Sequence, residues 1–174
     1  MNSKKKKMNK KLTLALYLFC GILFLQSCNS TKNLTTNYNY ELLCNGIGVE
    51  GVYLVKCFSY GSTFEKARKN VKKDAVHGTL FKGVSANSIK KCKEQPRICN
   101  VNYEENKDWF DRFFNEGDYL QYVTLSNDGN VSSKDRIKIK GGYKVGFTVS
   151  VKSDALRKRM EKEGFAKKMD VFDN

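Results

Sequence analysis

Apolar residues fall in short, separated runs along the chain, and the spacing within each run predicts strands or helices. Aromatic and β-branched residues are dense in several of these runs, which favours strands. The runs that we interpret as strands are residues 40–44, 52–60, 119–125, 137–139 and 143–151.

The first predicted helix begins at Ser62 and follows an apolar stripe that repeats every three or four residues. Ser62 and Glu65 have the spacing of a capping box, in which each side chain accepts a hydrogen bond from a free backbone N–H. Gly78 is the expected stop just after the last turn. A strand at 79–84 would follow, and the alternative is a helix that continues to Phe81.

Two more helices are predicted in the second half of the chain. Residues 104–116 carry aromatic side chains that would attach this helix to the core, and Gly117 ends it. Ser153 is expected to cap a final charged helix that runs through Glu163. A leucine and a methionine would form the inner side of this last helix.

The succession of strands and helices predicts an α+β fold in a single two-layer domain. Its sheet would be mixed but largely antiparallel, with the helices packed on one face. We expect the domain to span residues 39–165 and a C-terminal tail to occupy 166–174. The sequence indicates no internal repeat and no second domain.

The glycine-rich segment NGIGVEG at 45–51 matches the G-x-G-x-x-G pattern of dinucleotide-binding loops. That loop needs a helix after the glycines, because the helix N-terminus holds the phosphate. Here the glycines lead into the strand-like run 52–60 instead. We therefore interpret the segment as a hairpin connection or bulge between antiparallel strands.

The first 27 residues have the pattern of an export signal. Six lysines lie between positions 4 and 11 without an acidic residue, and an apolar run of 14 residues follows at 12–25. A helix that crosses a bilayer needs roughly 17–25 such residues, whereas the shorter run is typical of a signal peptide. An uncleaved anchor helix and an ordinary secretory signal are the alternatives.

The apolar run leads into the sequence LQSC at 25–28, which resembles the lipobox of bacterial lipoproteins. The resemblance implies a diacylglyceryl group on the Cys28 sulfur, cleavage after Ser27 and acylation of the new amino terminus. Two or more acyl chains hold a protein firmly on a bilayer. Asn29 in place of an aspartate suggests sorting to the outer membrane, and the polar segment 28–38 reads as a tether.

The charge of the chain changes once this signal is removed. Cleavage would remove six of the 32 basic residues and none of the 18 acidic ones, so the formal charge falls from +14 to +8. The remaining charge favours an acidic glycan, a lipid head group or an acidic protein as partner, and nucleic acid is not expected outside the cytoplasm. The candidate binding surface consists of Lys66, Lys69, Lys72 and Lys73. The alternative is that these lysines form only a solvated face of the helix.

Four cysteines remain when the signal peptide and Cys28 are set aside. An oxidising envelope permits disulfides, and four cysteines allow three connectivities. Cys92–Cys99 would close a short loop, and Cys44–Cys57 would join neighbouring strands if their registers coincide; the alternative is four free thiols. One histidine and no CxxC pair argue against a zinc site, and no metal or other cofactor is expected.

His77 is the only histidine, so a histidine-dependent hydrolase would have to use it with a cysteine or a carboxylate. Its predicted place in a last helical turn has a structural explanation, because an imidazole there can hydrogen-bond the open carbonyls. We interpret the acidic pairs around the second helix as its solvated side. The sequence contains no G-x-S-x-G motif. These features favour a non-catalytic role, with a periplasmic hydrolase as the alternative.

Four stretches of the predicted domain carry a family resemblance: LVKCFSYG, KARKNVKKDAVHGTLFKG, FFNEGDYLQYV and GYKVGFTVSV. They resemble a group of small lipoproteins from Gram-negative bacteria, over most of residues 40–165. More remotely, the domain is similar to the α/β domains of lipoproteins that assist secretion channels, flagella and peptidoglycan synthases. The resemblance implies a lipid-anchored envelope protein, and it supplies no catalytic motif. Together with the charge, it leads us to expect a domain that binds another envelope protein or an acidic glycan or lipid head group.

Overall fold

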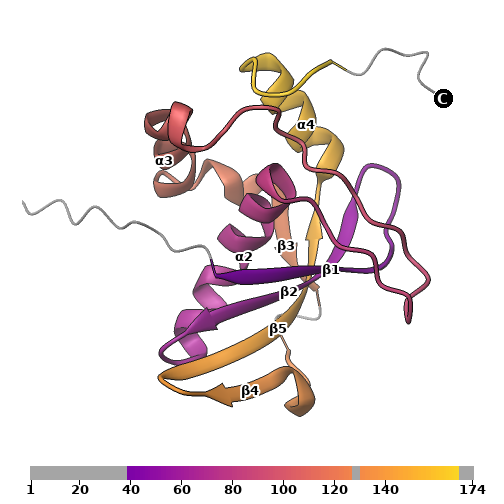
Figure 1. Cartoon of the computed structure of the whole chain (residues 1–174), viewed down its shortest axis with the longest axis vertical. Helices are drawn as coiled ribbons and strands as arrows, with labels where there is room; N and C mark the ends of the chain where they lie inside the picture. Colours follow the sequence, from indigo (N-terminus) through magenta and orange to yellow (C-terminus); the bar gives the residue numbers. More distant parts are fainter. Residues whose placement is uncertain (1–38, 127–129, 169–174) are drawn as a thin grey trace, which may run out of the picture. The chain divides into compact units, whose positions relative to one another are not determined.

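The computed structural model describes residues 39–126 and 130–168. The predictions for the signal peptide, for Cys28 and for the tether at 28–38 concern residues outside these ranges. Within them the chain has the predicted α+β fold, in which one antiparallel sheet packs against helices (Figure 1). No described helix is both long enough and apolar enough to cross a membrane.

A five-stranded sheet forms one layer of the domain. Its strands are β1 (Tyr40–Ile47), β2 (Tyr53–Gly61), β3 (Val123–Leu125), β4 (Arg136–Ile139) and β5 (Gly142–Val151). The named strands pair antiparallel in the order β1-β2-β5-β3, and β4 also pairs with β5. Strand β5 is therefore central, because β3 lies beside its last residues and β4 beside its first.

The other layer is helical. Its α-helices are α2 (Phe64–Phe81), α3 (Lys107–Asn115) and α4 (Ser153–Lys162), and its short 3-10 helices are η1 (Glu104–Asn106) and η2 (Asp118–Tyr122). A further 3-10 helix, η4 (Ser133–Asp135), lies beside β4 and β5. Helix α2 packs against β2 and β5 and lies behind the strands in Figure 1. Helices α3 and α4 both contact η2, which leads into β3.

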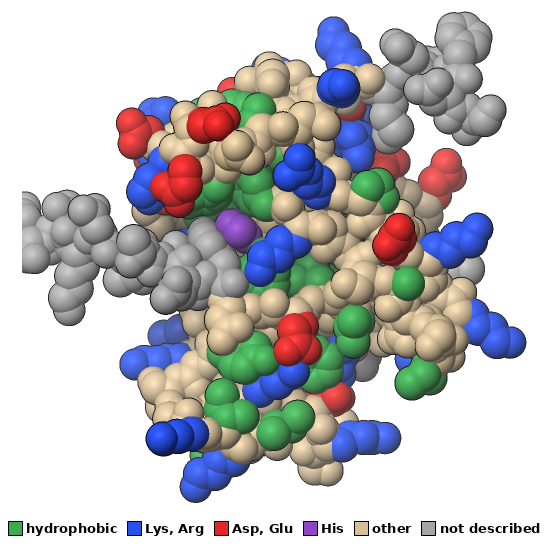
Figure 2. Space-filling view, in the orientation of Figure 1, with side chains coloured by type: hydrophobic (Ala, Val, Ile, Leu, Met, Phe, Trp, Pro, Cys, Tyr) green, Lys and Arg blue, Asp and Glu red, His purple; other side chains and the backbone are tan. Residues whose placement is uncertain are grey.

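Alternation along the strands separates a buried face of the sheet from an open one. The side chains buried on the inner face include Tyr40, Leu42, Cys44, Val55, Cys57, Val145, Phe147, Val149 and Val151. On the open face, Lys144 Nζ lies 4.9 Å from the centroid of the Phe58 ring and 2.6 Å from a Glu41 carboxylate oxygen. Figure 2 shows hydrophobic side chains mixed with lysines over this face.

Helix α2 is longer than the predicted helix and begins one residue later. Its N-cap is Thr63, whose Oγ1 accepts a hydrogen bond from a first-turn N–H at 3.2 Å, so the expected Ser62 cap is wrong. The helix continues to Phe81, which was the alternative, and the strand expected at 79–84 does not form. The left-handed residue that follows the helix is Gly83, with a φ of +81°.

Gly78 lies inside α2 because the helix makes close contact with β1 at this position. A Cβ on Gly78 would stand 2.7 Å from Leu42 Cδ1 and 2.8 Å from the Tyr40 ring. A glycine in the interior of a helix lowers its stability, so a packing reason is the usual explanation. The residue therefore serves the helix–sheet contact, and its interpretation as a helix stop was wrong.

The two later helices agree with the sequence except at their ends. Gly117, with a φ of +87°, follows α3 as predicted, but the first turn of the expected helix is the 3-10 helix η1. The strand expected at 119–125 is confirmed only for its last three residues, because the chain first forms η2. Ser153 does not cap α4; its Oγ donates a hydrogen bond to the Gly51 carbonyl at 3.0 Å.

The glycine segment 45–51 forms a bulged hairpin connection, as predicted. Strands β1 and β2 pair antiparallel, and their register shifts between Cys44 and Gly46. Gly46 and Gly51 have φ values of +140° and +73°, which residues with a Cβ rarely adopt. Strand β2 follows the glycines, so the helix N-terminus that a dinucleotide site requires is not formed there.

Aromatic side chains join α3 to the C-terminal end of the domain. The Trp109 ring stacks on Phe113 with centroids 5.2 Å apart, and Phe165 lies 4.9 Å from both Trp109 and Phe110. Ala166 is also buried. The folded domain therefore extends at least one residue into the segment that was expected to be a tail.

Candidate functional site

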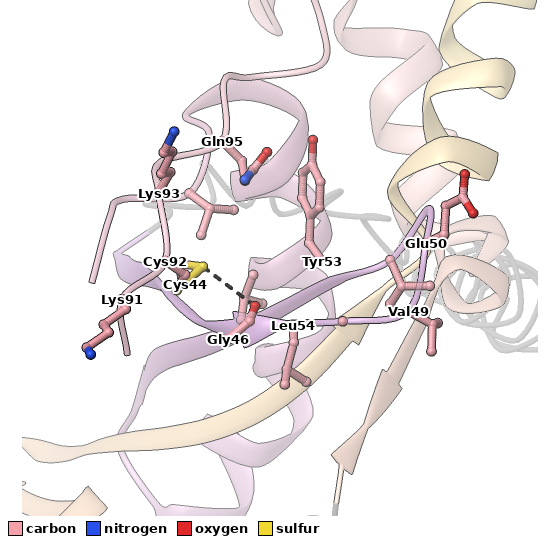
Figure 3. Close-up of a pocket in the computed structure, with 14 residues that line it drawn as sticks. Cys44, Gly46, Val49, Glu50, Tyr53, Leu54, Lys91, Cys92, Lys93 and Gln95 are labelled. Carbon is pink, nitrogen blue, oxygen red and sulfur yellow. Dashed lines mark hydrogen bonds between the residues drawn. A yellow bond between two sulfur atoms is a disulfide. The ribbon is translucent and has the colours of Figure 1, made fainter. Parts of the chain in front are cut away.

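A pocket of about 430 Å³ opens between the β1–β2 hairpin and the facing segment 84–95. Figure 3 shows Tyr53 rising from the hairpin, with Cys92, Lys93 and Gln95 on the facing segment. Small-molecule sites commonly have volumes of roughly 300–1,000 Å³ and a mainly apolar lining with a few polar groups. We therefore take this pocket as the candidate functional site.

The lining of the pocket combines aliphatic side chains with polar ones. The aliphatic side chains are Val49, Val52, Leu54, Val55 and Val84. The polar side chains are Glu50, Tyr53, Lys91, Lys93 and Gln95. Val55 and Val84 are almost fully buried at the inner wall, whereas Val49 is 75% exposed at the mouth.

A disulfide between Cys44 and Cys92 closes one side of the pocket and joins residues 48 positions apart, with their Cα atoms 6.0 Å apart. The predicted pairings Cys92–Cys99 and Cys44–Cys57 are therefore both wrong. Cys57 pairs in register with Leu42, two residues from Cys44, so the two cysteines are not opposite each other. Cys57 and Cys99 are free, buried thiols.

Hydrogen bonds hold both walls of the pocket in place. Val84 and Gln95 exchange two backbone hydrogen bonds of 2.8 Å, and Cys44 N donates to the Ser85 carbonyl at 2.8 Å. On the hairpin side, the Gly51 carbonyl accepts hydrogen bonds from α4, from Asp154 N at 3.2 Å and from a side-chain hydroxyl at 3.0 Å. Hydrogen bonds to neighbouring elements therefore hold both walls of the pocket in position.

Positive charge gathers beside the pocket on a tight turn. Asn87 and Cys92 exchange backbone hydrogen bonds across this turn, and Lys91 adopts a left-handed φ of +51° within it. Lys90, Lys91 and Lys93 are exposed, and no salt bridge between described residues involves them. On the other wall, burial raises the pKa of the Tyr53 hydroxyl, which therefore stays a neutral hydrogen-bonding group.

The two free thiols lie in the core and not in the pocket lining. Burial raises the pKa of Cys99 to about 12, and burial together with the nearby Asp74 carboxylate raises that of Cys57 well above its usual range. A thiolate is the reactive form of cysteine. Both side chains are therefore held in the unreactive thiol form.

His77 lies in an aromatic environment inside α2. Its Nδ1 is hydrogen-bonded to the Tyr40 hydroxyl at 2.6 Å, and its ring centroid lies 4.9 Å from Phe81, 5.4 Å from Tyr103 and 5.8 Å from Phe114. Burial, with help from two nearby lysine charges, lowers the pKa of His77 to about 3. The imidazole is therefore neutral at physiological pH, and it does not lie in the last turn where the sequence placed it.

One turn earlier in α2, Asp74 is a buried carboxylate that accepts a short hydrogen bond from the Ser59 hydroxyl on β2. Burial raises the pKa of Asp74 to about 6, and the Ser59 bond and the Lys73 and Lys82 charges only partly oppose this shift. The Asp74–Ser59 pair joins the helix to the sheet on the inner face. The pair is separate from the pocket, because neither residue lines it.

The lysine row on α2 is less uniform than the sequence indicated. Lys66 and Lys69 are exposed, but Lys72 and Lys73 are partly buried. The Lys73 ammonium lies 5.4 Å from the centroid of the Phe114 ring, and burial lowers its pKa. The candidate binding surface therefore contains two exposed lysines, Lys66 and Lys69, and two partly buried ones, of which Lys73 packs on the aromatic core.

Of the residues that line the pocket, Cys44, Cys92 and much of the glycine segment 45–51 were noted from the sequence, whereas Lys91, Lys93 and Gln95 were not. The run Lys90-Lys91-Cys92-Lys93 contained a signal, because a cysteine among lysines marks where a basic loop can be tied to the domain. The partner strand of that loop was not evident from the spacing of the cysteines. Among residues 39–126 and 130–168, no three His, Cys, Asp or Glu side chains lie close enough together to hold a metal ion.

Comparison with known proteins gives no further assignment for this pocket or for the fold around it. Neither a protein-family model, nor a curated protein, nor a solved structure matches this chain. Its class therefore follows from its own architecture, which is an α+β domain with an antiparallel sheet and a disulfide-bounded pocket.

Proposed function

We propose that this chain is a lipid-anchored protein of a bacterial cell envelope, on the outer membrane, and that its domain acts by binding. The leader of six lysines and an apolar run before Cys28 supports export and acylation. The Cys44–Cys92 disulfide supports the same compartment, because such bonds persist in oxidising environments and are rare in the cytoplasm. A tether of 11 residues would keep the domain within about 40 Å of the bilayer.

The observation that carries the binding role is the pocket beside the disulfide. Its walls are fixed by the disulfide and by backbone hydrogen bonds, so a ligand would meet a formed site. Its lining offers aliphatic contact, neutral hydrogen-bonding groups, two lysines and one glutamate, Glu50. We propose an acidic lipid or glycan group, or a side chain of another envelope protein, as its occupant, and no nucleic acid.

Two features support binding over a hydrolase that uses His77. The imidazole is enclosed by aromatic rings and bonded to Tyr40, and burial disfavours its protonated form. The two free thiols, Cys57 and Cys99, are fully buried and have raised pKa values. General acid–base or thiol chemistry would require at least one of these groups to reach a substrate.

Metabolic labelling with a palmitate analogue that carries an alkyne tests the anchoring. We expect the full-length chain to take up the label and to fractionate with membranes, because the lipobox directs acylation to the cysteine sulfur. Cys28→Ala should abolish labelling and leave the leader attached. Cys20→Ala, which changes a cysteine inside the leader, is the matched control and should label normally.

Labelling that survives Cys28→Ala would contradict the proposed anchor. Equal loss of label in Cys28→Ala and Cys20→Ala would show that the leader fails for a reason unrelated to a lipobox. An unlabelled wild-type chain in the cytosolic fraction would overturn both the location and the binding partners proposed from it.

A further inference from the structure

We propose that the pocket between the β1–β2 hairpin and segment 84–95 binds a single-chain amphipathic anion, meaning one acyl chain that ends in a carboxylate or a phosphate. This inference rests on the binding role proposed above and names the ligand of that same pocket. Free fatty acids and lysophospholipids share this chemistry, and the experiment below separates them.

The interior of the pocket has the chemistry of an alkyl-chain site. Val52 and Leu54 present partly exposed aliphatic surface to it, and Val55 and Val84 line it as almost fully buried side chains. The disulfide-bonded Cys44 and Cys92 also line it. None of these groups offers a strong hydrogen-bonding side chain, so a polar ligand placed there would lose its water without compensation. An alkyl chain gains from the same burial, because its apolar surface leaves water.

The edge of the pocket supplies the charge for an anionic head. Lys91 and Lys93 line it, and residues 90–97 contain four basic residues against the single acid Glu94. Lysine can lay its methylene stem along apolar surface while the ammonium stays in water. Figure 3 shows Glu50 at the hairpin tip, away from Lys91, so the anionic head belongs on the lysine side.

The pocket is organised before any ligand binds. The disulfide fixes the lysine turn to β1, the Val84–Gln95 pair closes the base of segment 84–95, and α4 holds the hairpin through the Gly51 carbonyl. Binding of a ligand therefore requires little additional ordering of the protein, and this favours affinity for a flexible chain.

Two exposed aliphatic residues provide a matched pair for the test. Val49 is 75% exposed at the mouth of the pocket, and Ile89 is 89% exposed at the tip of the neighbouring turn. Only Val49 lines the pocket. A ligand inside the pocket depends on Val49 alone, whereas contact of both loop tips with a bilayer surface would depend on both residues.

Photo-crosslinking in membranes that contain the full-length chain tests the proposal. The probe is a palmitate analogue with a diazirine in the chain and a terminal alkyne, and adducts are mapped by peptide mass spectrometry. We expect light-dependent adducts within 44–55 and 84–95. Val49→Glu should lower them about tenfold, because a charge must be desolvated at the mouth, and Ile89→Glu should leave them within about twofold.

Competition with ligands of one chain length tests the anionic head. Dodecanoate or lauroyl lysophosphatidate should displace the probe, and neutral dodecanol should do so far less. Displacement by dodecanoate alone would assign a free carboxylate, and displacement by the lysophosphatidate alone would assign a lipid head group. The double variant Lys91→Gln with Lys93→Gln should remove the difference between dodecanoate and dodecanol.

Three results would overturn the inference. Adducts confined to other peptides would exclude the pocket, equal losses in Val49→Glu and Ile89→Glu would assign a bilayer contact of the loop tips, and equal competition by dodecanol would exclude an anionic head. The light-independent label on Cys28 reports the anchor separately. Its loss without loss of the pocket adducts would count against the proposed location and not against this site.

Discussion

Asp74 and His77 lie one turn apart in α2, and burial moves their pKa values in opposite directions, to about 6 and about 3. A raised pKa means that folded Asp74 binds its proton more tightly than the unfolded chain does. Its contribution to stability is therefore lost as the pH rises from about 4 to about 6. Because the pKa of His77 is lowered, its contribution is present above about 6.5 and is lost as the pH falls below that value.

These opposite directions lead to a prediction for Asp74→Asn. Relative to the wild type, the variant should gain free energy of unfolding between pH 4 and pH 7, by up to about 3 kcal/mol, because it lacks the buried charge. His77 is present in both proteins, so its effect cancels in the comparison. Urea unfolding at pH 4, 5, 6 and 7 measures this difference.

The control is Asp108→Asn, which changes an exposed carboxylate on α3. Because this side chain is exposed, the substitution should change the free energy of unfolding by less than about 0.5 kcal/mol. A difference between Asp74→Asn and the wild type that does not change with pH would contradict the assigned burial of the carboxylate.

At the scale of elements, the contact between α2 and β1 depends on Gly78. Gly78→Ala should favour the helix by about 1 kcal/mol through propensity. The added Cβ would nevertheless meet Leu42 and Tyr40 at 2.7–2.8 Å, and overpacking of this kind typically costs about 1–3 kcal/mol. We expect a net loss of up to about 2 kcal/mol in the free energy of unfolding, measured by urea titration.

Lys69→Ala on the exposed side of the same helix is the control and should change stability by less than about 0.5 kcal/mol. If Gly78→Ala made the protein more stable, helix propensity would dominate at this site. The close contact between α2 and β1 would then have been misjudged.

The sequence predicted those helices and strands that are determined by residues close together in the chain. Glycines between two runs of strand residues indicated the β1–β2 hairpin, and the aromatic residues before Gly117 indicated α3. The end of α2 was misplaced because Gly78 is required by Tyr40 and Leu42, which lie on another element. Likewise, Ser153 has the residue type of a cap, but its hydroxyl bonds to the distant Gly51.

The candidate site was harder to predict than the fold, because it is made by two segments far apart in the sequence. The pairing Cys92–Cys99 is the closest in sequence, yet Cys99 enters the core with Ile98 while Cys92 stays on a surface turn. Cys44 and Cys92 come together only when Ser85 pairs beside β1. The pocket is formed by that pairing, and we recognised no sequence motif that would have indicated it.

For the whole molecule, the disulfide connects compartment, stability and site. A bond that closes a loop of this length, between residues 48 positions apart, contributes about 4 kcal/mol by restricting the unfolded chain. This is a large share of the stability of a small domain, which is about 5–15 kcal/mol. The same bond holds the lysine turn against the pocket. The bond is expected to persist in the oxidising environment of the proposed location.

Intact-mass and peptide analysis of the protein isolated from bacterial membranes tests this account most directly. We expect a chain that lacks residues 1–27, carries acyl groups on Cys28, contains a Cys44–Cys92 disulfide and keeps Cys57 and Cys99 as thiols. A chain that retains its leader, has no lipid and has four free thiols at these positions would contradict the account.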